Sequence, residues 1–240
     1  MYYNIGAGSF RHKDWINIDH SSDWYSGVQG EMIEWNLLEL SPIKIISNSA
    51  DLLYSSHVIE HVTDEAVQNL CNEMYRVLKP NSVARIQAPN VDIFYNNFKK
   101  NNITSWLANK NPSMSKIPLG NVSPAQAFVW AFASNATNIH RDGANKRLTD
   151  DMINKAFFEK DYVDALNYCT SFVSLEKQKK YPGNHMNWWN PTKIISMLEE
   201  VGFSEVYESH FGESKAIEMR DTKYFDFGHK GISFYVEARK

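Results

Sequence analysis

The stretch at residues 51–62, Asp-Leu-Leu-Tyr-Ser-Ser-His-Val-Ile-Glu-His-Val, constrains the fold of this chain more than any other. It begins with strand-forming residues, passes two serines and ends in His57, Glu60 and His61, just before a helix start at Thr63. This pattern predicts a buried strand that carries polar side chains to one edge of a sheet. In open α/β sheets, ligands bind at the edge formed by the carboxyl ends of the strands. We therefore expect the functional site near these three ionisable residues.

Composition narrows the class of function. The 240 residues include 28 acidic and 25 basic side chains, and a net charge of −3 does not favour non-specific binding to nucleic acid. No apolar run approaches the roughly 18 residues of a membrane span, and the N-terminus lacks the pattern of a secretion signal. Cys71 and Cys169 are too few for a disulfide framework. We expect a cytoplasmic α/β protein that binds neither a membrane nor nucleic acid.

A glycine turn and an acid form the second informative pattern. A short strand at residues 2–5 runs into Gly6-x-Gly8, where glycines let the backbone turn tightly and approach a ligand. A second strand at residues 15–19 ends in Asp19. In dinucleotide sites, an acid at this position accepts hydrogen bonds from the ribose hydroxyls. The alternative is an ordinary turn and an aspartate that only ends a strand.

The connection between these two strands is unusually short. Parallel neighbours normally need a crossover of about a dozen residues or more, yet only residues 6–14 lie between them. The helix N-terminus that usually faces a phosphate is therefore curtailed, and Arg11 replaces the third glycine of the dinucleotide fingerprint. These features argue against an NAD(P)-dependent oxidoreductase and less against an adenosyl ligand without phosphate.

The alternation of strands and helices continues toward residue 90. The predicted elements are strands at residues 32–35, 51–56 and 83–88, and a helix that begins after Thr63 and ends before Pro80. Asn36 and Leu37 follow the third strand, where a side-chain amide and an apolar face could meet an adenine ring.

The segments at residues 4–8, 15–19, 51–62 and 76–80 together resemble class I S-adenosylmethionine-dependent methyltransferases. Within that class they resemble the type-11-like group associated with sugars and cell-surface polysaccharide building blocks. The resemblance covers residues 1–90 and implies S-adenosylmethionine as cofactor. It also implies a Rossmann-like, seven-stranded, mostly parallel sheet whose last strand is antiparallel, plus an inserted, mainly helical cap. Departures are the missing N-terminal helices, the short first crossover and Asn81-Ser82, where Gly-Gly is common.

The resemblance also implies roles for single residues around the cofactor. Gly6 and Gly8 would approach its methionine part, Asp19 would hold the ribose, Asn36 and Leu37 would flank the adenine, and Ser56 or His57 would lie near the amino-acid end. The chain would then divide into a cofactor-binding half at residues 1–90, a helical cap over the acceptor at residues 91–189, and a C-terminal helix and strands at residues 190–240 that complete the sheet.

The cap region carries the candidate residues for the acceptor. Helices are expected at about residues 123–134 and 149–170, and between them lies a basic loop with His140 and Arg141. A guanidinium pairs bidentately with phosphate or carboxylate, so this loop could receive an anionic acceptor. The alternative is a solvated surface loop, which is also our reading of the basic run at residues 177–180.

Residues near the C-terminus supply further candidates. His185 and Trp189 could form a second wall of the acceptor site, although paired tryptophans usually belong to a core. Asn190 and Gly202 bound a helix, and two strands are expected to follow it at residues 205–211 and 232–238. The segment between these strands contains four side chains that could reach the acceptor: Arg220, Tyr224, Phe225 and His229.

Methyl transfer needs a general base only when the acceptor arrives protonated. His61 is the first choice because it follows the fourth strand and because an imidazole can take up a proton near neutral pH. His57, His140 and Tyr25 are rivals, and a purely structural role for His61 remains an alternative.

The same stretch raises the question of a metal. His57-x-x-Glu60-His61 matches the zinc pattern of inverted metalloproteases, but that motif belongs inside a helix, whereas here it straddles a strand end and a helix start. Some methyltransferases that this chain resembles bind Mg²⁺ through Glu-x-x-Glu-His at this place. His57 replaces the first acid, and a hard cation prefers oxygen ligands. The sequence therefore predicts no metal.

We expect an enzyme that transfers a methyl group from S-adenosylmethionine to nitrogen or oxygen of a small polar acceptor. Such an acceptor would be phosphorylated or sugar-like, as in the synthesis of polysaccharide precursors. The alternatives are a catalytically silent domain that binds the cofactor or a sugar and, less favoured, an NAD(P)-dependent oxidoreductase. The acceptor's identity and the oligomeric state stay open at this point.

Overall fold

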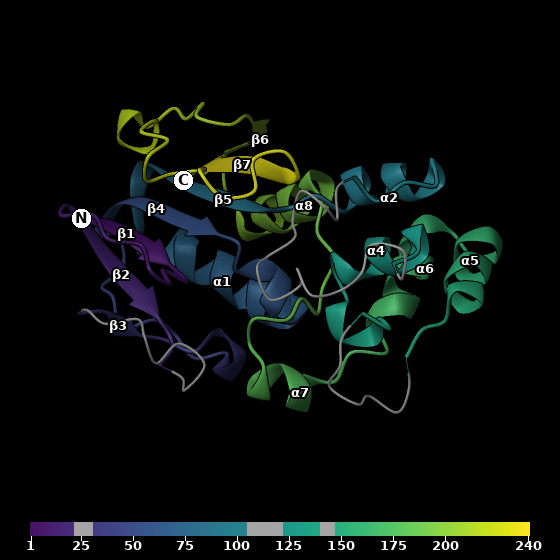
Figure 1. Ribbon diagram of the computed structural model, residues 1–240. Helices are drawn as coiled ribbons and strands as arrows, with labels where there is room; N and C mark the ends of the chain where they lie inside the picture. The colour runs from purple at the N-terminus through teal and green to yellow at the C-terminus, as the bar shows by residue number, and fades with distance from the viewer. Residues whose placement is uncertain (22–30, 105–121, 140–146) are drawn as a thin grey trace.

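A twisted seven-stranded sheet organises the chain in the computed structural model, which describes residues 1–21, 31–104, 122–139 and 147–240 (Figure 1). Its strands are β1 (Tyr2–Ile5), β2 (Trp15–Asp19), β3 (Ile33–Glu34), β4 (Ala50–Ser56), β5 (Leu78–Pro89), β6 (Glu205–Ser209) and β7 (Ser233–Arg239). The order across the sheet is β3-β2-β1-β4-β5-β7-β6. β7 runs antiparallel to both of its neighbours, and the other pairs are parallel. The predicted fold class is confirmed.

The register of the central strands brings three loops to one edge. Ile5 of β1 lies beside Ile18 of β2 and Ser55 of β4, so the residues that follow all three strands emerge together. The connection from β1 to β2 contains no helix, although the two strands are parallel. The short crossover expected from the sequence is therefore real, and the sheet edge there is lined by loop backbone.

The helices that cover one face begin and end where the sequence predicts. The Thr63 side chain accepts a hydrogen bond from the Ala66 N–H and starts α1 (Asp64–Val77). Asn190 caps α8 (Pro191–Val201) in the same way, and Gly202, with a φ of +109°, ends it in the left-handed region. Apolar side chains of α1 and α8 pack against the sheet in its main hydrophobic core. Two short 3₁₀ helices, η2 (Leu37–Glu39) and η3 (Ile59–His61), lie at the ligand edge.

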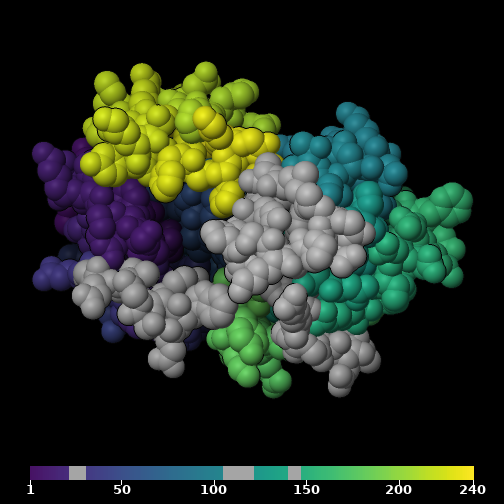
Figure 2. Space-filling view, viewed as in Figure 1, coloured from purple at the N-terminus to yellow at the C-terminus, as the bar shows by residue number. Residues whose placement is uncertain are grey.

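The other face of the sheet is covered by the segment between β6 and β7, which includes η7 (Ile217–Met219). Phe225 and Met219 are fully buried there against Trp15 and Tyr54. Because side chains alternate along a strand, Tyr54 belongs to this cluster while its neighbour Leu53 belongs to the main core. Figure 2 shows the C-terminal segment, in yellow, beside the purple N-terminal strands.

The helices of the cap region have a hydrophobic core of their own, on the right in Figure 1. They are α2 (Val91–Lys99), α4 (Pro124–Trp130), η6 (Ser134–Ala136), α5 (Asp150–Glu159), α6 (Tyr162–Thr170) and α7 (Leu175–Lys180). Phe128, Phe94 and Leu166 are among its buried members. The division of the chain at residues 90 and 189 stays a prediction.

Several expected boundaries were wrong. The helix expected at residues 149–170 breaks at Lys160, whose backbone is extended with φ −111° and ψ 156°, so α5 and α6 are separate. The basic run at residues 177–180 was expected to be a loop but belongs to α7. The third strand is shorter than expected, and β5 begins at Leu78, directly after α1, because the chain continues through Pro80 in extended form.

Within the described residues, the helices are all too short or too polar to cross a membrane. Cys71 and Cys169 are unpaired, and both side chains are fully buried.

Candidate functional site

A cavity of about 880 Å³ opens at the carboxyl edge of β1, β2 and β4. It is large enough to enclose a small-molecule ligand. The residues predicted for the cofactor all line it: Gly6, Gly8, Asp19, Asn36, Leu37, Ser56 and His57. His61, the first choice for a general base, also lies on its wall. The structure thus brings together residues that come from four separate loops.

The glycine turn and Asp19 contact each other directly. The Gly8 N–H donates to Asp19 Oδ2 over 2.6 Å, and the His20 N–H donates to Oδ1 over 2.7 Å. Gly6 has a φ of +68°, and a Cβ there would overlap Cγ2 of Val58. Gly6 therefore satisfies two demands at once, a left-handed backbone and close contact with the residue that follows His57.

The opposite wall of the cofactor region is formed around η2. Asn36 Oδ1 accepts the Leu38 N–H over 3.1 Å and so caps this short helix. Leu37 is buried and presents an apolar surface to the cavity. Trp35 and Leu38 line the same wall. An amide and an apolar surface are therefore placed side by side, as the sequence suggested for adenine, although their role in binding stays a prediction.

Ser56 and Gln87 connect the sheet edge to the C-terminal segment. Ser56 donates its hydroxyl to Gln87 Oε1 over 2.8 Å, and Gln87 Nε2 donates to the carbonyl of Gly228 over 2.7 Å. Gln87 is itself buried, so this link is held inside the protein. It fixes the turn that brings Gly228 and His229 onto the cavity wall.

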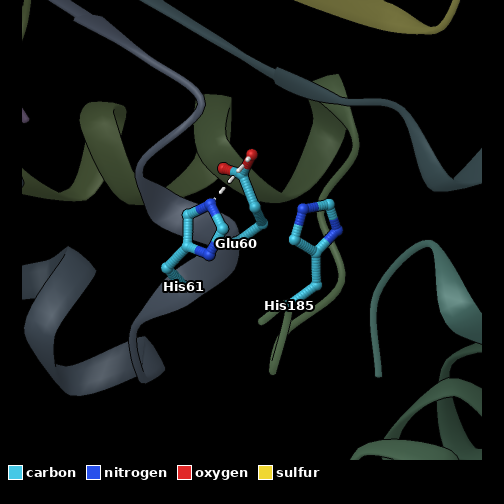
Figure 3. A group of neighbouring side chains, drawn as sticks. All are labelled: Glu60, His61 and His185. Atoms are coloured by element: carbon cyan, nitrogen blue, oxygen red, sulfur yellow. Dashed lines mark ion pairs between the residues drawn. The ribbon is translucent and has the colours of Figure 1, made fainter. Parts of the chain in front are cut away.

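Three histidines gather around Glu60 at the other end of the cavity. The residue is only 1% exposed, and its Oε1 lies 3.1 Å from His57 Nδ1 and 3.7 Å from His61 Nε2. Burial alone would raise the pKa of Glu60, but the neighbouring His61 and His57 outweigh it and hold the pKa at about 2. Figure 3 shows the Glu60 side chain between the rings of His61 and His185. Glu60 is thus a buried carboxylate within a group of imidazoles.

His185 reaches this group from the segment before α8. Its backbone N–H donates to Ser134 Oγ over 3.0 Å, and its Nδ1 lies 2.6 Å from the carbonyl oxygen of Ala131. The next residue, Met186, donates its N–H to the carbonyl of Glu60 over 2.8 Å. Burial lowers the pKa of His185 to about 4, and the neighbouring His61 acts in the same direction. His185 does not line the cavity and lies behind His61, with ring centroids 4.9 Å apart.

Three predicted acceptor residues do not line the cavity: His185, described above, and also Trp189 and Arg220. Trp189 is 1% exposed and donates its Nε1–H to the carbonyl of Ile59 over 2.9 Å, so it belongs to the core. Arg220 lines a separate hollow of about 360 Å³ and donates from Nε to the carbonyl of Ser214. Neither side chain faces the cavity in this structure, and the expected contact of each with an acceptor gains no support from its position. Tyr25, His140 and Arg141 lie outside the described residues.

Other cavity residues were anticipated only in part. Tyr224 and His229 do line the cavity, whereas Phe225 is buried in the aromatic cluster beneath it. Gln178 and Lys179 of α7 also contribute, and no local signal in the sequence marks them, because the helix reaches the site only through the packing of the cap. Short helices of this kind carry little periodic signal.

A comparison with protein families gives one match. Residues 16–86 match a family model described as a methyltransferase domain, which corresponds to less than a third of the 240 residues. The match includes Asp19, Leu37 and the stretch at residues 51–62. The match supports, for this segment, the prediction of a methyltransferase that uses S-adenosylmethionine as its cofactor.

Solved structures of S-adenosylmethionine-dependent methyltransferases are among the similar ones. One from Archaeoglobus fulgidus is 13% identical, with a TM-score of 0.46, and the match covers 100% of this chain and 85% of that one. One from Mesorhizobium loti is 12% identical, with a TM-score of 0.45 and coverage of 100% and 90%. Human N-acetylserotonin methyltransferase in complex with S-adenosylmethionine is 12% identical, with a TM-score of 0.43 and coverage of 100% and 47%. Similarities this weak carry no information about the acceptor. A search of curated proteins gives no match.

Proposed function

We propose that this chain transfers a methyl group from S-adenosylmethionine to nitrogen or oxygen of a small polar acceptor that is phosphorylated or sugar-like, a type of compound used in polysaccharide precursor synthesis. The observation that carries the proposal is the direct contact of the Gly8 N–H with Asp19 Oδ2 on the wall of the cavity, within a chain that matches a methyltransferase domain.

The residues present fit this cofactor. Gly6 lets the backbone of the cavity wall pack against Val58, where a Cβ would collide. Each carboxylate oxygen of Asp19 accepts one backbone N–H and retains a lone pair for a ribose hydroxyl. The connection at residues 6–14 offers no helix N-terminus to a pyrophosphate, which favours an adenosyl compound over a dinucleotide. When bound, S-adenosylmethionine supplies a methyl group already activated on a sulfonium.

Because the donor is activated, the chain's main contribution is to align the acceptor and to exclude water. A hydroxyl or ammonium acceptor must also lose a proton. Both ring nitrogens of His57 have polar neighbours, since Nδ1 lies near Glu60 and Nε2 lies 3.0 Å from Ser233 Oγ. His61 Nε2 makes no hydrogen bond within the described chain. We therefore assign to His61 the role of the base that takes the proton from the acceptor.

The acceptor end of the cavity supports a polar, anionic molecule. Lys179 from α7 and Lys223 from the segment before β7 line it from two sides. A lysine ammonium is a compact point charge that can pair with a phosphate or carboxylate. We also propose that residues 91–189 act as a cap that shapes this end, and that residues 1–90 and 190–240 supply the cofactor site and the remaining sheet.

The deciding experiment has a binding arm and a product arm. Calorimetry with S-adenosylmethionine and with NAD identifies the cofactor, and we expect heat only from the former. The protein is then incubated with S-adenosylmethionine and pooled sugar nucleotides and amino-alcohol phosphates, and mass spectrometry searches for a product that has gained one methyl group. Cofactor binding without product or S-adenosylhomocysteine across the panel would identify a silent binding domain. Binding of NAD alone would contradict the proposal.

A further inference from the structure

Glu60, His61 and His185 converge on one point. One ligand atom of each lies within 4.8 Å of the ligand atoms of the other two (Figure 3). Two of the residues belong to η3, and the third comes from the segment before α8. The Met186 N–H holds the two segments together by donating to the carbonyl of Glu60 over 2.8 Å. The cluster is therefore part of the packed structure and not an accident of surface side chains.

The hydrogen bonds of the two histidines select a particular tautomer. His61 Nδ1 lies 2.9 Å from the carbonyl oxygen of Asn184, and His185 Nδ1 lies 2.6 Å from that of Ala131. A carbonyl oxygen only accepts hydrogen bonds, so both Nδ1 atoms carry a proton, and in the neutral ring Nε2 then presents a lone pair to a metal. Metal-binding histidines in proteins are usually oriented by this kind of outer hydrogen bond.

The carboxylate of Glu60 lacks a partner on one side. Oε1 is engaged by His57, but Oε2 is buried and makes no hydrogen bond to any described residue. A buried anionic oxygen without a partner is costly, and native structures rarely leave one unless a water or an ion completes it. The orphaned oxygen is a second observation, independent of the distances, that points to a missing ligand.

We propose that Glu60, His61 and His185 bind one divalent transition-metal ion, and that this ion is Zn²⁺. Two imidazoles and one carboxylate are the ligand set of many zinc sites and suit the first-row transition metals. Mg²⁺ and Ca²⁺ prefer sites made of oxygen alone. Three protein ligands leave at least one coordination position open, which is the pattern of catalytic rather than structural zinc.

This site could not be found from local spacing. The sequence argued against a metal because His57 replaces an acid in the motif at residues 57–61, but His57 is not one of the three ligands. It instead contacts Oε1 of Glu60 and so orients the ligating carboxylate. The third ligand, His185, lies far along the chain and reaches the site through the fold.

The position of the site suggests that the ion binds the acceptor, an inference that rests on the proposed function. His61 is shared between the metal cluster and the wall of the large cavity. An ion at this boundary would hold an oxygen or nitrogen of the acceptor and lower the pKa of a coordinated hydroxyl. With the ion bound, His61 Nε2 is occupied, so His61 would promote proton loss through the metal and would not take the proton itself.

Zinc binding can be tested without knowledge of the acceptor. Full-length protein stripped with a chelator is dialysed to equilibrium against Zn²⁺, and Co²⁺ serves as a spectroscopic probe because its visible bands report coordination geometry. We compare His61→Ala, His185→Ala and Glu60→Gln with His210→Ala, whose side chain is 80% exposed and lies outside the cluster. Circular dichroism and calorimetry with S-adenosylmethionine show whether each variant still folds and binds the cofactor.

We expect the wild type and His210→Ala to bind one Zn²⁺ per chain with equal affinity and to select it over Mg²⁺. Each ligand variant should lose about 100-fold in affinity or more, since loss of outer-shell partners alone costs about 10–100-fold. Equal zinc affinity in the wild type, His61→Ala and His185→Ala would overturn the proposal, as would a preference for Mg²⁺. Failure to bind S-adenosylmethionine with intact zinc binding would instead contradict the proposed function and leave the metal site standing.

Discussion

The two ends of the cavity are built in different ways. The cofactor end is made by loops that directly follow neighbouring strands, with Gly6 after β1 and Asp19 at the end of β2. The histidine end joins η3 to His185, which lies in the segment before α8 and is held by Ala131 of the cap. The first end needs only the sheet, whereas the second exists only when the cap has packed against it. We therefore expect mutations at one end to leave ligand binding at the other intact.

The largest effect should come from Gly6→Ala. Gly6 and Gly8 both have positive φ, +68° and +49°, but only at Gly6 does a Cβ collide, with Val58. The left-handed backbone costs about 1–2 kcal/mol at either position, and overpacking adds roughly 1–3 kcal/mol at Gly6. Gly6→Ala should therefore abolish measurable cofactor binding and lower the free energy of unfolding by about 3 kcal/mol. Urea denaturation and calorimetry measure the two effects.

Val58 gives this prediction a matched test. Gly8→Ala, with open space around its Cβ, is the control and should show only the backbone cost. In the double variant Gly6→Ala, Val58→Ala, the atoms that collide with the new Cβ are gone, so part of the lost stability should return. If Gly8→Ala were as harmful as Gly6→Ala, close contact with Val58 would not explain the glycine at position 6.

The next largest effect is expected from Asp19→Ala, which tests whether the cofactor end and the histidine end of the cavity bind their ligands independently. Removal of a charged acceptor of two ribose hydroxyls, at roughly 1.5–3 kcal/mol per hydrogen bond to a charged group, should weaken S-adenosylmethionine at least about 100-fold. Zinc affinity should not change, because the carboxylate is remote from the histidine end. Calorimetry measures the first effect and equilibrium dialysis the second. Asp14→Ala, with a side chain that is 57% exposed, is the control. Parallel loss of both ligands would show that the two ends are not independent.

This contrast also explains which parts of the molecule the sequence could predict. Residues a few positions apart set the carboxyl ends of β1, β2 and β4, the cap of α1 at Thr63 and the end of α8 at Gly202, so their patterns are visible locally. The same holds for Gly6-x-Gly8 and Asp19, because parallel register alone brings them together. Local chemistry was enough for the sheet and for the cofactor end.

The histidine end depends instead on contacts between segments that are distant in the sequence, and so do the positions of the residues expected at the acceptor. The pairing of His185 with Glu60 depends on how the cap packs, and so does the arrival of Lys179 at the cavity. Trp189 was considered as an acceptor wall because indoles stack on sugars, but the packing of the core takes up its ring. A single sequence does not reveal contacts between distant segments, which is why all the residues predicted for the cofactor line the cavity, whereas His185, Trp189 and Arg220 do not.

A pH titration of stability probes His185 at the histidine end. The pKa of His185 is about 4 in the folded chain and 6.5 as the unperturbed value, chiefly because of burial. The unfolded chain therefore binds more protons between these values, and stability is lost as pH falls through this window. Between pH 7.5 and pH 5, His185 should lower the free energy of unfolding by about 2 kcal/mol. Urea denaturation with a chelator present measures it at both pH values.

His185→Gln should reduce this pH dependence by about that amount. His229 stays in the variant, and its pKa is also lowered by burial, so a smaller loss in the same direction should remain. Glu60 adds little at pH 5, because its pKa falls from 4.5 to about 2 and its contribution is lost only in more acidic solution. An unchanged loss in His185→Gln would mean that His185 is not held neutral by the fold.

Arg220→Ala should have the smallest effect and tests the boundary of the site. The guanidinium lines a hollow formed by the β6 end of the sheet and is tied to the carbonyl of Ser214, away from the cavity that holds Asp19 and His61. Its loss should change cofactor affinity and the KM for the acceptor by less than about 2-fold, since the side chain does not line the cavity and an exposed charge acts weakly through salt solution. Lys179→Ala is the matched cation on the cavity wall and should raise the KM for an anionic acceptor about 10-fold, within the roughly 1.5–3 kcal/mol of a charged hydrogen bond. Steady-state kinetics with the acceptor found in the mass-spectrometric screen measures both, and a larger loss at Arg220 than at Lys179 would place the acceptor outside the cavity.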